Sequence, residues 1–314
     1  MFLSIIMPSY NVEQYIEDCL TSCLRQEIDK TEYEVIVIND GSKDSTLDVV
    51  NSFIEKHPTA PIRVVSQENS GLSATRNRGV TLAQGDYVWF VDSDDWITEN
   101  CLKELHNNIT KHNQPDIVVL NTILRKGGED TVIDRKLPSD KEGNGKYIYD
   151  NSYIFPYSGA PFYLFKRSFL KDNDLSFKEG IYFEDCLFTP SALSMAKHCS
   201  YYSQPVYIYR LRENSITTSS ISEKKLYDSI TVAEELIKRL GDGRVLYKDV
   251  IKDAACRTYE VLFRYYILKS DKPTQKKFLK LVNSNDNWKS LLGDVRLKHV
   301  IYYLIARVYS VFMG

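Results

Sequence analysis

The sequence has 314 residues, of which 43% are hydrophobic and 26% are charged, and its formal net charge is −2. This composition is typical of a globular protein, and the nearly neutral charge excludes a general nucleic-acid binder, which needs an excess of basic residues. The charge is unevenly distributed, because residues 1–220 hold 22 Lys and Arg against 31 Asp and Glu, whereas residues 221–314 hold 18 against 11. We therefore expect one large domain at 1–220 and a smaller basic region at 221–314.

The cysteines and the apolar segments indicate the compartment. No two of the six cysteines have CxxC spacing, and no His lies near them in sequence, so buried thiols are favoured over a zinc site. The stretch that ends at Pro8 is too short for a signal peptide, and no apolar run reaches the roughly 18 residues of a membrane span. These features predict a cytoplasmic protein with reduced thiols.

The first 91 residues alternate between apolar runs and helical periodicity. The expected strands are 2–8, 33–38, 62–65 and 87–91, and the expected helices are 12–25, 46–55 and a short helix around 76–78. The connections are long enough for crossovers, so we predict an α/β fold with a mostly parallel sheet sandwiched by helices. Ligands of such sheets bind beyond the carboxyl ends of the strands.

Polar residues follow three of these strands. After the last strand, Asp92, Asp94 and Asp95 fall within four positions, and burying such charges without compensation costs several kcal/mol. One interpretation is a Mg²⁺ or Mn²⁺ site, and the other is an acidic turn in which Asp95 caps a helix that starts near residue 97. Tyr10 and Asp40 follow two other strands at the same expected edge, which favours the metal site.

The next hundred residues continue the alternation less regularly. The expected elements are a helix at 97–112, a strand at 116–121, a polar hairpin or loop at 125–150, a strand and helix at 162–170, a helix from 184 to about 197 and a strand at 201–210. Glu184 and Asp185 open one of these helices, where carboxylates are stabilised by the helix dipole. A purely structural role for this acidic pair therefore stays open. Arg210 and Arg212 lie in an expected basic loop.

The C-terminal region has a different character. Four amphipathic, lysine-rich helices are expected at 223–240, 245–270, 272–283 and 288–313. The last helix has an apolar stripe that either packs on the protein itself or on a second copy in a homodimer, or lies on a membrane surface. A helix that lies on a membrane surface would make the protein peripheral on the inner face of the plasma membrane.

Known motifs narrow the chemistry. The chain has no GxxxxGK[ST] phosphate loop, no GxGxxG after its first strand, and no GxSxG or HExxH. A parallel sheet with a carboxylate-held cation at its edge then favours a sugar nucleotide as ligand, in which the metal neutralises the leaving diphosphate.

Five stretches in this order resemble the family 2 glycosyltransferases of the GT-A fold. They are residues 4–11, 38–46, 69–79, 85–95 and 184–185. The match is dense over 1–110, thinner to about 217, and absent from 221–314. The resemblance implies a Rossmann-like GT-A catalytic domain at 1–220, followed by a C-terminal helical extension.

The resemblance also implies roles for individual residues. Asp94 would hold the metal, and Asp92 would contact the ribose or the metal. Tyr10 would lie against the nucleobase, Asp40 would accept its N–H, and Asp185 would be the catalytic base. Other donor-site residues implied by the resemblance are Pro8, Glu13, Arg76 and Ser93. More loosely, donor or diphosphate contacts are expected for Gly159, Ala160, Glu184, Arg210 and Arg212, although a solvated loop explains the two arginines equally well.

The expected reaction is a single displacement that inverts the configuration at the anomeric carbon of the sugar. The sugar moves from a nucleotide-sugar donor, most simply a UDP-sugar, to a hydroxyl. The resemblance suggests a glycan, lipid-linked or protein acceptor in the assembly of bacterial polysaccharides or glycoconjugates, and a hexosyl or hexosaminyl group. Two alternatives remain. A sugar nucleotidyltransferase would normally carry a Gly- and Lys-rich loop after the first strand, which residues 9–11 are not. An inactive scaffold of the same fold would not need to keep Asp40, Asp92, Asp94 and Asp185.

Overall fold

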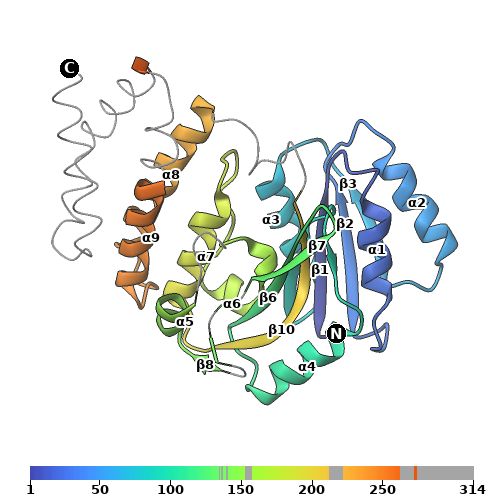
Figure 1. Ribbon diagram of the computed structural model, residues 1–314, viewed down its shortest axis with the longest axis horizontal. Coiled ribbons are helices and arrows are strands. Elements are labelled where there is room, and N and C mark those ends of the chain that lie inside the picture. The colour runs from blue at the N-terminus through green and yellow to red at the C-terminus, as the bar shows by residue number, and fades with distance from the viewer. Residues whose placement is uncertain are drawn as a thin grey trace. The chain divides into compact units, whose positions relative to one another are not determined.

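The computed structural model describes residues 1–133, 135, 137–138, 141–152, 158–211, 222–261 and 272–273 (Figure 1). Contacts divide the chain into two compact units. The first unit comprises residues 1–180 and 196–218, and the second comprises residues 181–195 and 219–314.

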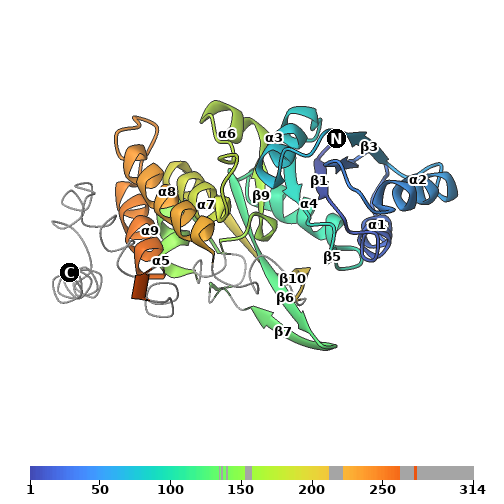
Figure 2. The same ribbon diagram turned by 90° about the horizontal axis from the view of Figure 1, so that it is seen from above.

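The first unit contains a sheet whose first half is parallel. Its strands run in the order β3-β2-β1-β4, with β1 at Leu3–Ser9, β2 at Tyr33–Asn39, β3 at Ile62–Ser66 and β4 at Tyr87–Phe90. All three pairings are parallel. The connecting helices are α1 (Ile16–Leu24), α2 (Thr46–Lys56) and α3 (Leu72–Leu82). Figures 1 and 2 show α1 and α2 on one face of these strands and α3 on the other. The predicted α/β fold is confirmed.

Beyond β4 the sheet is mixed, in the order β4-β9-β6-β10-β5. The bounds are β5 Trp96–Ile97, β6 Ile117–Lys126, β7 Glu129–Ile133, β8 Glu142–Gly143, β9 Tyr163–Lys166 and β10 Cys199–Arg210. The short β9 is antiparallel to both neighbours, and β6 with β10 is parallel. The mostly parallel arrangement that we predict therefore holds for the first four strands, and beyond them the described pairings are antiparallel except that of β6 with β10. The helices here are α4 (Cys101–Lys111), α5 (Gly145–Asn151), the 3-10 helix η1 (Ala160–Phe162) and α6 (Arg167–Asp172).

The glycine-rich stretch after β6 forms a hairpin, one of the two predicted alternatives. The strand β7 pairs antiparallel with β6, and the pair closes at Lys126 and Glu129. The two residues between them, Gly127 and Gly128, have φ of 57° and 90°. A two-residue turn needs positive φ at these positions, which glycine adopts without strain.

The prediction that Asp95 caps a helix is wrong. The helix α4 begins at Cys101, and its N-cap residue is Asn100. The residues after Asp95 form β5 instead, because Trp96 and Ile97 pair antiparallel with Ile208 and Tyr207 of β10. A pairing across more than a hundred residues thus overrides the local helical signal.

In its described residues, the second unit contains three helices and the loops that join them. The helices are α7 (Glu184–Met195), α8 (Glu223–Arg239) and α9 (Lys248–Val261), and each packs against the other two. Nearly every side chain of α7 is buried, as expected for a helix that is enclosed on all sides. The helix that opens with Glu184 and Asp185 therefore groups with α8 and α9 and not with the sheet, so the contacts divide the chain differently from our boundary at 220. The division of roles between the two regions stays a prediction.

The expected helix at 288–313, with its membrane-surface alternative, lies outside the described residues. Among the helices that are described, none combines the length and the apolar character that crossing a bilayer requires. All six thiols are free, and all except the half-buried Cys186 are buried, as the sequence predicts.

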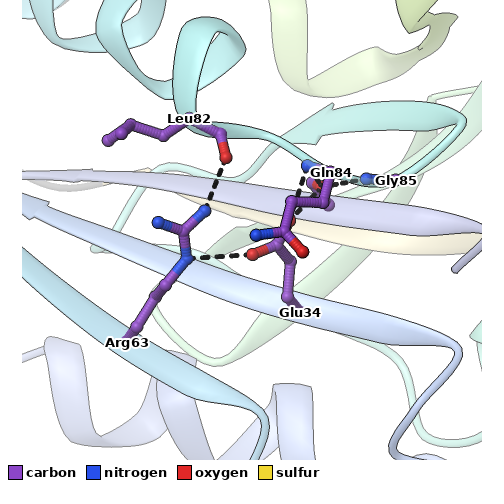
Figure 3. Close-up of polar contacts among 6 residues, drawn as sticks. Glu34, Arg63, Leu82, Gln84 and Gly85 are labelled. Atoms are coloured by element: carbon purple, nitrogen blue, oxygen red, sulfur yellow. Dashed lines mark hydrogen bonds and ion pairs between the residues drawn. The ribbon is translucent and has the colours of Figure 1, made fainter.

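A buried carboxylate ties together the amino-terminal side of the parallel strands (Figure 3). Glu34 of β2 is 7% exposed and accepts a hydrogen bond of 2.7 Å from the Ser4 hydroxyl of β1. It also accepts from the backbone N–H of Gln84 at 2.8 Å and forms an ion pair of 2.9 Å with Arg63 of β3. One side chain thereby joins β1, β2, β3 and the segment that leads into β4.

The next residue, Gly85, approaches β1 more closely than any other residue type allows. Its N–H donates to the Ser4 hydroxyl at 2.9 Å. A Cβ atom at Gly85 would lie 2.5 Å from the backbone carbonyl carbon of Leu3 and the backbone nitrogen of Ser4. Because backbone atoms cannot move aside cheaply, a glycine is needed here. The close approach sets where β4 begins, and therefore where Asp92 emerges at its other end.

We expect Glu34→Ala to lower the free energy of unfolding by about 2 kcal/mol, because buried donors lose their acceptor. Urea denaturation followed by circular dichroism measures this loss. The matched control is Glu55→Ala on the exposed face of α2, which should change stability by less than about 0.5 kcal/mol. Equal effects of the two substitutions would contradict the role assigned to Glu34.

Candidate active site

The loops after β1 and β2 are bonded to each other. The backbone N–H of Lys43 donates to the Asn11 side-chain carbonyl at 2.8 Å. The Glu13 carboxylate accepts from the backbone N–H of Ser45 at 2.8 Å, and the Glu13 N–H donates to the Asp44 carboxylate at 3.2 Å. Glu13, which we predict at the donor site, is thus used to join the two loops in this structure.

Three further predicted donor-site residues lie at the end of β1. Tyr10 is 46% exposed, so its aromatic side chain is accessible for stacking. The buried Ser93 donates its hydroxyl proton to the backbone carbonyl of Pro8 at 2.8 Å. This bond ties the end of β1 to the turn after β4, which brings Tyr10 and the aspartates to one edge of the sheet.

Asp40 is held by the segment that precedes α3. One carboxylate oxygen accepts from the Gln67 side-chain amide at 2.7 Å and from the Ser70 N–H at 2.9 Å, and the other accepts from the Gly71 N–H at 2.9 Å. Burial acts to raise the pKa of the Asp40 carboxyl, but these hydrogen bonds outweigh it and hold the pKa below its usual range. From the described residues, Oδ2 receives one of the two hydrogen bonds that it is able to accept.

Arg76 reaches the aspartates from α3. Its guanidinium forms an ion pair of 2.9 Å with the Asp92 carboxylate and lies over the Phe177 ring at 5.2 Å. Arg76 is only 1% exposed, whereas the Asp92 side chain is 29% exposed. That Arg76 faces the donor stays a prediction; in this structure its guanidinium is paired with Asp92.

Asp95 is buried beneath the turn. It accepts a hydrogen bond of 2.5 Å from the Tyr207 hydroxyl and one of 2.7 Å from the Arg210 backbone N–H. Burial, followed by the negative charges of Asp94 and Asp92, raises the pKa of the Asp95 carboxyl well above its usual range. The Tyr207 oxygen also accepts from the Asp92 N–H at 3.3 Å, so one tyrosine contacts both ends of the turn.

Arg210 is the last residue of β10, which agrees with the predicted strand at 201–210, and it therefore stands where the predicted loop begins. Its side chain donates to the Asp94 backbone carbonyl at 3.0 Å and forms an ion pair of 3.1 Å with Asp18. Its guanidinium also lies 4.5 Å from the Trp96 ring. These contacts fix the backbone of the aspartate turn. Arg212 lies outside the described residues.

Ala160 is the first residue of the short η1 helix, and Gly159 precedes it as the N-cap. Ala160 is fully buried, and a Cβ at Gly159 would lie 3.1 Å from the Phe162 ring. Their contact with the donor stays a prediction.

Glu184 and Asp185 are the first two residues of α7 in the second unit. Glu184 is buried and Asp185 is half-buried. The preceding residue, Phe183, has φ of 64°, which is rare for an aromatic residue. No sequence motif indicates the positive φ of Phe183. The sequence also does not indicate that Tyr207, Gln67 and Phe177 contact residues of the site.

Asp40→Asn should destabilise the protein by about 2 kcal/mol at pH 7, because an amide cannot satisfy all the donors that surround it. Since the folded pKa is lowered, the carboxylate contributes stability above the unfolded pKa of about 3.9 and loses it as the pH falls through the folded pKa. Urea denaturation at pH 7 and pH 3 should therefore show a smaller effect at pH 3. The control is Asp48→Asn on the exposed face of α2; an Asp40→Asn effect that does not change with pH would contradict the assignment.

Known proteins share this sequence pattern. The family model described as glycosyl transferase family 2 matches residues 4–176. The uncharacterized glycosyltransferase EpsJ of Bacillus subtilis is 33% identical over 68% of this chain and 62% of its own length. The poly(ribitol-phosphate) beta-N-acetylglucosaminyltransferase TarS of Staphylococcus aureus is 30% identical over 80% of this chain and 43% of TarS. The chain thus spans less than two thirds of either relative.

Solved structures agree with the predicted GT-A fold. TarS residues 1–349 in complex with UDP-GlcNAc match with a TM-score of 0.75 and 27% identity over 90% of this chain and 80% of that one. A mannosyltransferase of Pyrobaculum calidifontis in complex with GDP-Man and Mn²⁺ shares the fold, with a TM-score of 0.57 and 16% identity over 99% of this chain and 83% of that one. Since the family model covers more than half of the sequence, this chain belongs to glycosyl transferase family 2.

Proposed function

We propose that the chain is an inverting glycosyltransferase that moves a sugar from a UDP-sugar to an acceptor hydroxyl. The observation that carries this proposal is that Tyr10, Asp40 and Asp92 follow three adjacent parallel strands at one edge of the sheet, where nucleotides bind in such folds. Membership of the family supports the reaction class. The TarS complex with UDP-GlcNAc supports a UDP-sugar, and UDP-GlcNAc first among them.

In this proposal the nucleobase lies against Tyr10 and Asp40. The exposed Tyr10 ring stacks on the base. The remaining acceptor position of Asp40 Oδ2 takes the imide N–H of uracil. Because Asp40 is already held by its neighbours, its orientation costs little additional entropy when the nucleotide binds.

We propose Asp94, with Asp92, as ligands of Mg²⁺ or Mn²⁺. Both offer carboxylate oxygens, which these ions prefer. Asp92, Asp94 and Asp95 fall within four positions, so the turn is rich in carboxylates. No group of three or more ligating side chains is found within the described ranges, and Mg²⁺ needs only one or two carboxylates beside the phosphates of its ligand. When bound, the cation neutralises charge on the leaving diphosphate.

The proposed base is Asp185. The acceptor hydroxyl attacks the anomeric carbon from the face opposite the nucleotide, and Asp185 takes its proton. A single displacement of this kind inverts the configuration. No second catalytic carboxylate is needed, because the nucleoside diphosphate is already a good leaving group.

For the acceptor, we propose a hydroxyl of a glycan or polyol chain. Support comes from relatives whose names specify poly(ribitol-phosphate), among them a beta-glucosyltransferase of Bacillus spizizenii that is 34% identical over 68% of this chain and 33% of its own length. The proposal also includes lipid-linked and protein acceptors. It further includes a cytoplasmic location and a peripheral contact with a membrane.

The first test is a donor screen by thermal shift with Mn²⁺. A ligand at one hundred times its Kd stabilises the folded state by about 2.7 kcal/mol, so UDP-GlcNAc or UDP-glucose should raise Tm by several degrees. GDP-mannose is the control and should raise Tm by less than about one degree. A larger shift with GDP-mannose would overturn the choice of UDP.

The second test separates the metal ligand from the base. Asp94→Asn should abolish metal-dependent binding of the donor, measured by calorimetry. Asp185→Asn should keep donor binding and lose UDP release by about 100-fold or more, the usual size of a general-base effect. Asp48→Asn, at an exposed position, serves as the control for both variants. Normal turnover by Asp185→Asn would exclude Asp185 as the base.

A further inference from the structure

The backbone just before α7 is strained. Phe183 has φ of 64°, a conformation that bulky residues rarely adopt. The N–H of Cys186 donates to the Phe183 carbonyl at 3.0 Å, so this residue forms the first turn from which Glu184 and Asp185 project. Such conformations persist only where surrounding contacts hold them.

One of those contacts comes from α8. The buried Asp228, which is 7% exposed, accepts a hydrogen bond of 2.9 Å from the backbone N–H of Tyr182. The same carboxylate oxygen forms an ion pair of 2.7 Å with Lys224, whose ammonium lies 5.1 Å from the centre of the Tyr182 ring. A charge-compensated carboxylate therefore holds the residue directly before Phe183.

The other end of α7 is held as well. The Ser194 carbonyl accepts hydrogen bonds of 3.0 Å from the backbone N–H groups of Leu246 and Tyr247, which precede α9. Because both ends of α7 are bonded to α8 or to the segment before α9, the helix cannot easily rotate or slide within the second unit. All of these residues lie beyond residue 176, where the family match ends.

We propose that Asp228 is a positioning residue for the transfer reaction. Through Tyr182 it holds the strained turn at Phe183, and the turn fixes the direction in which the Asp185 carboxylate leaves α7. This inference rests on the proposed role of Asp185 as the base. It gives the C-terminal helices a part in catalysis in addition to acceptor, partner or membrane contacts.

The test compares two aspartates that each form an ion pair across one helical turn. Asp228→Ala removes the acceptor of Tyr182 and the Lys224 pair, whereas Asp253→Ala removes a pair with Arg257 on α9. Both substitutions should lower Tm by similar amounts. Only Asp228→Ala should lower kcat, by about 10- to 100-fold, because misplacing a catalytic group by about 1 Å has effects of this size. The KM for the UDP-sugar should stay within about twofold.

The conservative change Asp228→Asn should restore most of the activity, because the amide oxygen can still accept from Tyr182. A wild-type kcat in Asp228→Ala, or an equal loss in Asp253→Ala, would overturn the inference. If Asp228→Ala does not fold, Lys224→Met takes its place, with an expected loss in kcat of about threefold to tenfold, and an unchanged kcat counts against the proposal.

Asp185→Asn is measured in parallel. Normal turnover by Asp185→Asn would refute the assignment of Asp185 as the base. The positioning role of Asp228 would then have no basis. An inactive Asp185→Asn beside a fully active Asp228→Ala would refute the positioning role alone.

Discussion

The concentration of negative charge in the turn after β4 is the constraint on which the rest of the first unit depends. Two unit charges about 4 Å apart repel by about 4 kcal/mol at an effective dielectric constant of 20, and this turn contains three carboxylates within four residues. The chain offsets the charges in different ways. Asp92 is paired with the buried Arg76, Asp95 is hydrogen-bonded by Tyr207, and Arg210 bonds the backbone carbonyl of Asp94. The partners come from α3 and β10, so the turn also decides how these elements pack.

The sequence alone predicts the parallel half of the fold well, because its strands are short and mostly apolar and the helices between them have clear periodicity. It also predicts which strand ends carry polar residues. The direction of β9 is not predictable, because a strand of four residues does not indicate whether its neighbours are parallel or antiparallel. The pairing of β5 with β10 also cannot be predicted from the sequence. The expected cap at Asp95 is wrong because of this pairing.

The candidate site is predictable where its residues fall within one short motif, and not where contacts span the chain. Arg76 is recognisable in sequence, but its burial depends on Phe177, a hundred residues further on. The strand β10 contains four tyrosines, and an irregular register around Pro205 breaks the alternation of its side chains. The alternation of side chains along the strand therefore cannot show that Tyr207 is the tyrosine that faces the aspartates.

The position of β1 at the centre of the parallel strands has a consequence for folding during synthesis. It pairs on one side with β2, some thirty residues later in the chain, and on the other with β4, which ends at Phe90. Until that residue has left the ribosome, one edge of β1 has exposed N–H and C=O groups in a strand that is mostly apolar. Such an edge is prone to pairing with other chains. The nascent chain is therefore most vulnerable to aggregation before the aspartate turn is made, and the pairing of β4 with β1 ends that period.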